Sequence, residues 1–194
     1  MRIVTYVLIV LCITTITFAD ESKQVILKVG DKAPQFAAVA DNNELWDSQN
    51  HIGKHILVVY FYPGAMTAGC TTEACSYRDD LQELKNLGVE VIGISGDSVK
   101  NQQLFKQVNH LNFTLLSDVN GEIAKKFGVP VRQGGSTTQV LNNKKITLNR
   151  GVTASRWTFV IDKSGTIIYK NTSVDPAKDS QQVIAVIKGI EKEK

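Results

Sequence analysis

The stretch Ile56-Leu57-Val58-Val59-Tyr60-Phe61-Tyr62-Pro63-Gly64-Ala65-Met66-Thr67-Ala68-Gly69-Cys70 decides the fold of this chain. Its first seven residues have the continuous apolar character of a strand that is covered on both sides, and a helical pattern follows Cys70. A cysteine at such a junction lies where backbone N–H groups are unpaired and the helix dipole is positive, which lowers a thiol pKa. Cys75, five residues later, can trap what Cys70 becomes. The pattern therefore predicts a redox enzyme.

The bulk composition predicts one soluble globular domain. The chain has 194 residues, of which 43% are hydrophobic and 21% are charged. A domain of this size buries enough apolar surface to fold without covalent cross-links. Cys70 and Cys75 are therefore not needed as a scaffold.

The N-terminus has the pattern of a secretory signal peptide. Met1-Arg2 is a short basic start, residues 3–18 are mainly apolar, and Thr17-Phe18-Ala19 offers small residues at both ends of a cleavage motif. We expect cleavage after Ala19, export to the periplasm or the exterior, and a single mature domain over residues 20–194. A retained anchor helix is the alternative, but roughly 16 residues are short for spanning a membrane. Cys12 would leave with the signal.

The charge pattern does not favour nucleic-acid binding. Cleavage removes one arginine from 22 basic residues and none of the 19 acidic ones, which leaves 21 − 19 = +2. Lysine pairs such as Lys125-Lys126 and Lys144-Lys145 are scattered and are typical of solvated faces. We expect no nucleic-acid partner.

Apolar periodicity and turn signals predict alternating strands and helices. The expected strands are 36–39, 45–46, 55–62, 89–95, 113–116, 158–162 and 166–170. The expected helices are 70–87, one that Asp97 or Ser98 caps, one from Asp118 to Phe127, and 176–190. Residues 129–155 are expected to be less regular.

The expected helix over 70–87 places the two cysteines differently. Its apolar stripe consists of Ala74, Tyr77, Leu81, Leu84 and Leu87. Cys70 extends this stripe backwards, so its sulfur is expected to point toward the core, whereas Cys75 lies off the stripe. Strand–helix–strand–helix–strand, followed by a hairpin and a helix, predicts an α/β fold with a central mixed sheet covered on both faces. That matches a thioredoxin-like fold with extra N-terminal and inserted elements.

The motif Pro63-x-x-x-Thr67-x-x-Cys70 is similar to the active-site signature of peroxiredoxins. The position of Cys75 resembles the bacterioferritin comigratory protein (Q-type) branch. The resemblance covers about residues 28–191. It extends to Tyr62-Pro63, Ala74-Cys75, Arg78-Asp79, Gly93-Ile94-Ser95, Phe113-Thr114-Leu115-Leu116-Ser117-Asp118 and Arg156 ahead of Thr158-Phe159-Val160-Ile161-Asp162.

The resemblance implies a thiol-dependent peroxidase for hydrogen peroxide and organic hydroperoxides, with a role in antioxidant defence. Cys70 would be the peroxidatic cysteine and Cys75 the resolving cysteine, which form a Cys70–Cys75 disulfide. Thr67 would hydrogen-bond near the thiolate and the peroxide, Arg156 would supply fixed positive charge, and Pro63 would shape the pocket wall and exclude water.

Helix geometry sets a condition on that disulfide. Residues five apart on an intact helix lie about 7.5 Å apart along the axis and roughly 140° around it. Their Cα atoms are then about 8–9 Å apart, beyond the roughly 7 Å limit for bridging. The first turns of the helix must therefore unwind before the disulfide forms.

Three positions near Cys70 qualify the resemblance. Ala68 stands where proline is common in the family and Gly64 where lysine is common, and both are expected to loosen the loop. Glu73 suits the first turn of a helix, but close to Cys70 it would oppose thiolate formation. Arg156 must then outweigh it.

The expected partners are a peroxide and a thioredoxin-like or glutaredoxin-like electron donor, and for an exported protein the donor would be thioredoxin-like. We expect no cofactor and a monomer, because the local cysteine pair needs no second subunit. His51, His55 and His110 lack metal-ligand spacing with the cysteines, so no metal is expected.

Two other interpretations of the cysteine pair remain open. A thiol–disulfide oxidoreductase would separate its cysteines by two residues, whereas four separate Cys70 from Cys75. A secreted, non-enzymatic domain could use the pair as a structural disulfide, although such a short ring stabilises a fold little. Pro63, Thr67 and Arg156 each have an ordinary structural interpretation when taken singly.

Overall fold

The structure is a computed structural model that describes residues 25–192. The predicted signal peptide over residues 1–19 lies outside the described part. Within residues 25–192, no helix is long and apolar enough to cross a membrane. The strands are β1 (Ala37–Val39), β2 (Leu45–Asp47), β3 (Ile56–Phe61), β4 (Val89–Ser95), β5 (Thr114–Ser117), β6 (Val131–Leu141), β7 (Lys144–Ala154), β8 (Trp157–Ile161) and β9 (Ile167–Asn171). The helices are α1 (Ala68–Asp79), α2 (Leu81–Asn86), α3 (Val99–Asn109), α4 (Glu122–Lys126) and α5 (Asp179–Lys192), with a short 3-10 helix, η1 (Ser48–Asn50).

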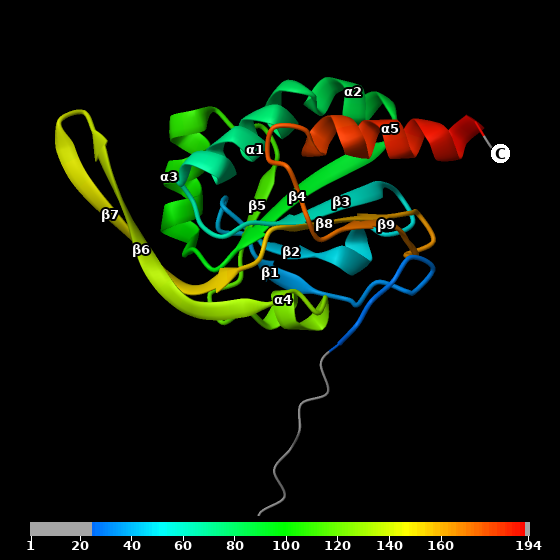
Figure 1. The fold of residues 1–194 in the computed structure, drawn as a ribbon, viewed down its shortest axis with the longest axis horizontal. Helices are drawn as coiled ribbons and strands as arrows, with labels where there is room; N and C mark the ends of the chain where they lie inside the picture. The colour runs from blue at the N-terminus through cyan, green and yellow to red at the C-terminus, as the bar shows by residue number, and fades with distance from the viewer. Residues whose placement is uncertain (1–24, 193–194) are drawn as a thin grey trace, which may run out of the picture.

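A five-stranded mixed sheet forms the centre of the molecule, in the order β5-β4-β3-β8-β9 (Figure 1). Strands β3, β4 and β5 are parallel, whereas β8 pairs antiparallel with both β3 and β9. The prediction of a central mixed sheet with helices on both faces is confirmed. Strand β3 lies in the middle of this sheet, as its continuous apolar run predicted.

Alternate residues of β3 serve two hydrophobic cores, because successive strand side chains point to opposite faces. Val58 and Tyr60 belong to the core under α1, α2, α3 and α5, together with Tyr77 and Leu84. The other face of the sheet packs against α4 and the β1–β2 pair, through a core of Leu57, Val59, Phe61, Phe36, Trp46 and Phe127. The predicted stripe on the helix after Cys70 is thus a core face, and Cys70 itself is 1% exposed.

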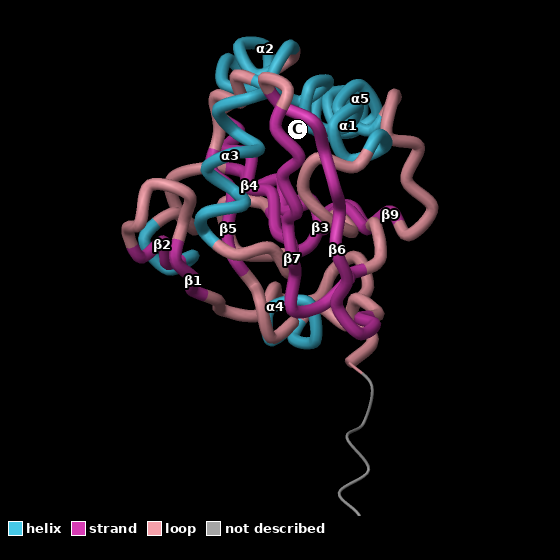
Figure 2. The backbone as a smooth tube through the Cα atoms, turned by 90° about the vertical axis from the view of Figure 1, so that its left-hand side faces the viewer, coloured by secondary structure: helices cyan, strands magenta, loops and turns pink. Residues whose placement is uncertain are grey.

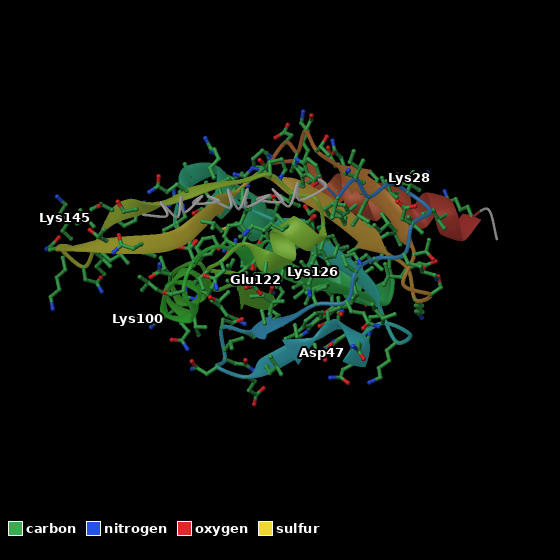
Figure 3. All side chains as sticks on the ribbon, turned by 90° about the horizontal axis from the view of Figure 1, so that it is seen from below. Lys28, Asp47, Lys100, Glu122, Lys126 and Lys145 are labelled. Carbon is green, nitrogen blue, oxygen red and sulfur yellow. The ribbon has the colours of Figure 1, made fainter. Side chains whose placement is uncertain are left out.

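The region that was expected to be less regular is a long β-hairpin, so that prediction is wrong. Strands β6 and β7 pair antiparallel over eleven residues each, from Val131↔Ala154 to Leu141↔Lys144. The hairpin arches away from the sheet and past α3 (Figures 1 and 2). Lys145 lies near its far end (Figure 3). The sequence did not indicate this hairpin, because its strands are polar. A strand pair with much of both faces exposed shows little alternation of apolar and polar residues.

Three helices differ from their predicted bounds. The helix expected from Asp118 to Phe127 is the shorter α4, at whose start the Asp118 carboxylate accepts the N–H groups of Ile123 and Ala124. The predicted helix 70–87 is divided at Asp80 into α1 and α2, and the Asp80 carboxylate accepts a hydrogen bond of 2.6 Å from Ser180 on α5. The last helix starts at Asp179 rather than at residue 176. Asp175 instead holds a turn there, because its carboxylate and carbonyl accept the N–H groups of Ala177 and Lys178.

Candidate active site

Cys70 lies in the first turn of α1, directly beyond the end of the central strand. Strand β3 ends at Phe61, and α1 begins after Thr67, which has the extended backbone of an N-cap (φ −82°, ψ 150°). The first intrahelical hydrogen bond runs from the N–H of Thr71 to the carbonyl of Thr67 at 2.9 Å. The N–H groups of Gly69 and Cys70 precede that bond, so they are among the donors that a helix leaves free at its start.

Arg156 reaches Cys70 from the short connection between β7 and β8. Its Nη2 donates to Cys70 Sγ at 3.2 Å, and its Nη1 donates a hydrogen bond to Glu73 Oε2. Gly69 lies beside the guanidinium, where an added β-carbon would be 3.4 Å from Nη2, an ordinary contact distance. The structure thus brings together Cys70 and Arg156, which lie 86 residues apart in the sequence.

Glu73 is fully buried beneath this pair. Burial raises the pKa of Glu73 from 4.5 to about 8, with Asp179 adding to the rise and Arg156 opposing it. A carboxyl with that pKa holds a proton at neutral pH, so it leaves the guanidinium charge available to Cys70. The conflict expected between Glu73 and a thiolate is therefore reduced by protonation of Glu73 as well as by Arg156.

Thr67 and Pro63 lie in the loop that leads into α1. The Thr67 hydroxyl donates to the carbonyl of Gly64 at 3.0 Å, so in this state it braces the loop rather than capping the helix. Pro63 is half-buried. The structure places both residues in the loop before Cys70, and their roles toward a peroxide remain predictions.

Cys75 is half-buried and lies on the same unbroken helix as Cys70, and both cysteines are free thiols. Arg78 Nη1 lies 3.4 Å from Cys75 Sγ and also donates to the carbonyl of Asn109 on α3 at 2.7 Å. Cys75 therefore has its own cationic neighbour. The five-residue spacing on an intact helix keeps its Cα about 8–9 Å from that of Cys70.

Sequence reasoning missed Asp179, a buried acid that interacts with Glu73. Asp179 Oδ2 accepts from Tyr77 Oη at 2.6 Å and from Thr158 Oγ1 at 2.7 Å. Burial raises the pKa of Asp179. Its position at the start of a helix is an ordinary place for aspartate, so no pattern in the sequence indicated that it would lie in the core near Glu73.

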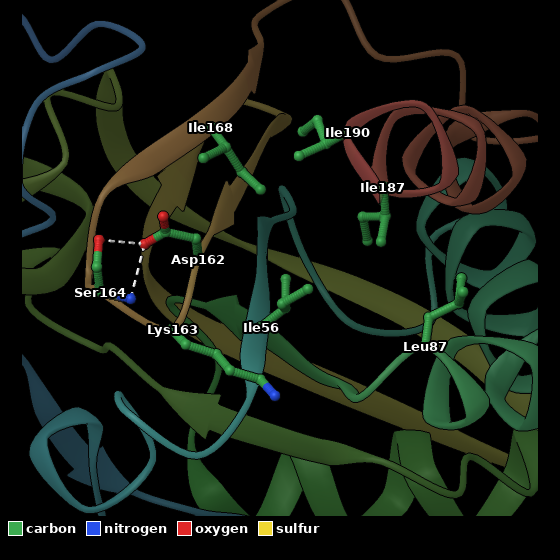
Figure 4. Close-up of a pocket in the computed structure, with 8 residues that line it drawn as sticks. All are labelled: Ile56, Leu87, Asp162, Lys163, Ser164, Ile168, Ile187 and Ile190. Carbon is green, nitrogen blue, oxygen red and sulfur yellow. Dashed lines mark hydrogen bonds between the residues drawn. The ribbon is translucent and has the colours of Figure 1, made fainter. Parts of the chain in front are cut away.

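A separate surface cavity of about 700 Å³ lies at the other end of the sheet (Figure 4). Its lining includes Ile56 at the start of β3, and Ile187 and Ile190 of α5. Asp162 also lines it and accepts a hydrogen bond from the Ser164 hydroxyl. Cys70 follows the opposite end of β3, and neither cysteine lines the cavity. This cavity is therefore distinct from the thiol site.

The fold and the site together define a thioredoxin-like thiol enzyme. Residues 29–170 match the AhpC/TSA family. A putative peroxiredoxin bcp of Coxiella burnetii is 39% identical over 151 residues, which cover 77% of this chain and 92% of that protein. Peroxiredoxin Q, chloroplastic, of Oryza sativa subsp. japonica is 33% identical over 162 residues, which cover 83% of this chain and 67% of that protein.

Solved structures agree with these relatives. The crystal structure of peroxidoxin BcpB from Mycobacterium tuberculosis has a TM-score of 0.71 and 28% identity, covering 85% of this chain and 99% of that one. The bacterioferritin comigratory protein of Xanthomonas campestris has a TM-score of 0.65 and 26% identity, covering 80% and 91%. The chain belongs to the AhpC/TSA family and is a peroxiredoxin of the Bcp and peroxiredoxin Q branch, that is, a thiol-dependent peroxidase.

Proposed function

We propose that Cys70 is the peroxidatic cysteine. Its thiolate attacks one oxygen of a hydroperoxide, a sulfur–oxygen bond forms as the oxygen–oxygen bond breaks, and the leaving oxygen takes a proton from solvent to become water or an alcohol. The observation that carries the proposal is the Nη2–Sγ contact of 3.2 Å between Arg156 and a buried thiol at a helix N-terminus. Fixed donors of this kind stabilise the thiolate and the charge that develops on the leaving oxygen.

Thr67 and Pro63 complete the proposed pocket. The Thr67 hydroxyl, now bound to the Gly64 carbonyl, lies at the N-cap three residues before the reacting sulfur. A small rotation frees it to donate to the peroxide. Pro63 has no N–H and forms part of the wall that keeps water from Cys70.

Cys75 is the proposed resolving cysteine. Its thiolate attacks the sulfur of the Cys70 sulfenic acid, the disulfide forms, and hydroxide leaves to be protonated as water. Arg78 Nη1 lies 3.4 Å from Cys75 Sγ, beside the attacking sulfur. Since the intact α1 holds the two residues too far apart, the first turns of α1 unwind during this step.

A dithiol electron donor then reduces the Cys70–Cys75 disulfide by thiol–disulfide exchange and returns both thiols. We propose a thioredoxin-like or glutaredoxin-like protein as this donor. The substrates are hydrogen peroxide and organic hydroperoxides. The bacterioferritin comigratory protein of Xanthomonas campestris has alkyl peroxide reduction activity, which supports the second class of substrate.

The remaining parts of the proposal concern the whole protein. Residues 1–19 act as a cleaved signal that exports the mature domain to the periplasm or the exterior, where a donor of the thioredoxin type must supply electrons. The mature domain, residues 20–194, works as a monomer, because both reacting cysteines lie on one helix. Size-exclusion chromatography with light scattering and N-terminal sequencing of the exported protein test these two points.

Peroxide consumption tests the function. The chain without residues 1–19 is assayed with hydrogen peroxide and a dithiol, beside its Cys70→Ser and Cys75→Ser variants. We expect Cys70→Ser to be inactive. With the dithiol left out, Cys75→Ser should react once per molecule and then stop, until an external thiol resolves the sulfenic acid. Turnover by Cys70→Ser refutes the assignment of Cys70. Reduction of protein disulfides without peroxide consumption would instead identify a thiol–disulfide oxidoreductase.

A further inference from the structure

The loop before Thr67 contains a backbone conformation that side chains rarely adopt. Met66 has φ +63°, in the left-handed region. Non-glycine residues avoid this region unless their surroundings hold them there, and such conformations concentrate at functional sites. Met66 is the last residue before the N-cap of α1, so its backbone angles set where Thr67 and the first turn of the helix lie.

The β6–β7 hairpin holds Met66 in this conformation. Gln139, on the part of β6 that runs past α3, donates its Nε2–H to the carbonyl of Met66 at 2.7 Å. The Met66 side chain is 8% exposed, and Asn109 Nδ2 lies 3.6 Å from its sulfur. Both the backbone and the side chain of Met66 are thus held by residues distant in the sequence.

The same hairpin covers the residue two positions earlier. The Arg150 guanidinium lies across Gly64, where an added β-carbon would lie 2.9 Å from Nη1. Arg150 is itself held on the hairpin, because its Nε donates to Thr153 Oγ1 at 2.9 Å and its Nη1 to Thr137 Oγ1 at 3.1 Å. An added β-carbon at position 64 would therefore require the Arg150 side chain to shift. Whether Gly64 loosens the loop stays a prediction.

The residue between these two is held from the loop between β4 and α3. The N–H of Ala65 donates to Asp97 Oδ2 at 2.7 Å, and Asp97 also forms an isolated bridge with Arg150 in the hairpin. Ala65 and Met66 are thus each hydrogen-bonded to a residue outside the loop, and Arg150 lies against Gly64. Two of the three contacts come directly from the hairpin.

We propose that the β6–β7 hairpin clamps the active-site loop and that Gln139 is a positioning residue for the reaction of Cys70 with peroxide. The inference rests on the function proposed above for Cys70 and Thr67. When the Met66 carbonyl loses its donor, the peptide between Met66 and Thr67 is free to rotate, and the Thr67 hydroxyl and the first N–H groups of α1 move with it. Displacements of about 1 Å in such groups are enough to slow a reaction strongly.

The clamp also defines where the proposed unwinding begins. It ends at Met66, whereas α1 begins at Ala68. The helix can therefore unwind from Thr67 onward while the loop from Gly64 to Met66 stays in place. When the Cys70–Cys75 disulfide is reduced, the first turn of α1 re-forms next to a loop that has kept its conformation.

The test compares two glutamines on one strand. Gln139→Glu keeps the size of the side chain but replaces the N–H donor with an oxygen that repels the Met66 carbonyl. Gln133→Glu is the matched control, because Gln133 lies on β6 with an exposed side chain. Gln139→Lys restores a donor. Steady-state kinetics give kcat/KM separately for hydrogen peroxide and for the dithiol donor, and thermal melting reports folding.

We expect Gln139→Glu to lower kcat/KM for peroxide about three- to tenfold while kcat/KM for the donor stays unchanged. Gln139→Lys should recover to within about twofold of the original chain, and Gln133→Glu should match it. The clamp is overturned if Gln139→Glu is folded with unchanged peroxide kinetics, or if Gln133→Glu loses as much. Should Gln139→Glu not fold, Gln139→Ala takes its place under the same criteria. Cys70→Ser, assayed in parallel, separates this outcome from failure of the proposed function, since only that failure leaves Cys70→Ser active.

Discussion

Replacing Glu73 with glutamine should change how the stability of this protein depends on pH. Glu73 is fully buried, one of its oxygens pairs with Arg156, and its other oxygen has no hydrogen-bond partner within residues 25–192. Burial raises its pKa from 4.5 to about 8. Between these two values the folded chain holds a proton on Glu73 that the unfolded chain has released. Unfolding therefore releases a proton, and stability from this group falls as the pH rises through that interval.

The size of the effect follows from the two pKa values. At about 1.4 kcal/mol for each tenfold change in the protonation equilibrium, the difference between 4.5 and about 8 corresponds to a loss of about 5 kcal/mol at most. The loss is complete above about pH 8. Glu73→Gln removes this titration, so the free energy of unfolding of the variant should decline less over the same range. Asp179, whose pKa is also raised, titrates in both proteins and largely cancels in the comparison.

Urea unfolding of the reduced protein at several pH values between about 5 and 8.5 measures the difference. Glu122→Gln is the matched control, because Glu122 is an exposed glutamate in the first turn of α4. We expect the curves of the original chain and Glu122→Gln to fall in parallel, and the Glu73→Gln curve to be flatter by about 2–5 kcal/mol across the range. Three parallel curves would refute the protonated, buried state of Glu73.

Three further predictions concern the site and its support. Arg156→Lys should slow the reaction of Cys70 with peroxide by about 10- to 100-fold in stopped-flow kinetics, because one ammonium cannot replace the two-sided guanidinium contact, and an unchanged rate would contradict this role. Oxidation should remove hydrogen-exchange protection over residues 70–78 but not over α5, and equal protection in both redox states would exclude local unwinding. Gly93→Ala should destabilise the fold by about 1–3 kcal/mol in urea, because a β-carbon there lies 2.7 Å from the buried Tyr60 Oη; unchanged stability would show that the core can adjust.

The sequence predicted the parts of the fold that local patterns determine. The apolar run of β3, the change to a helical period after Cys70 and the stripe through Tyr77 and Leu84 each reflect burial, and the structure buries all of them. The β6–β7 hairpin was not predicted, because its strands are polar. A usable signal was present at Asn142-Asn143, where both residues have positive φ, as a tight hairpin turn requires.

The candidate site was predictable only in part, because some of its contacts form between segments that are distant in the sequence. Cys70 and Thr67 lie in one local motif, and the resemblance added Arg156. The contact of Gln139 with Met66 and the buried position of Asp179 depend on tertiary packing between distant segments. No periodicity or spacing in one sequence indicates such contacts. The raised pKa of Glu73 likewise depends on burial, which the first-turn position alone did not predict.

The mass of one peptide tests the central claim most directly. Trypsin cleaves after Lys54 and Arg78, so residues 55–78 form a single peptide that contains both Cys70 and Cys75. After one equivalent of hydrogen peroxide, followed by alkylation of free thiols, we expect this peptide to have lost two hydrogens and to carry no alkyl group. In Cys75→Ser it should instead carry one added oxygen at Cys70, which dimedone traps. Two alkylated cysteines in the original chain, or oxidation confined to Cys75, would contradict the assignment of Cys70 as peroxidatic and Cys75 as resolving.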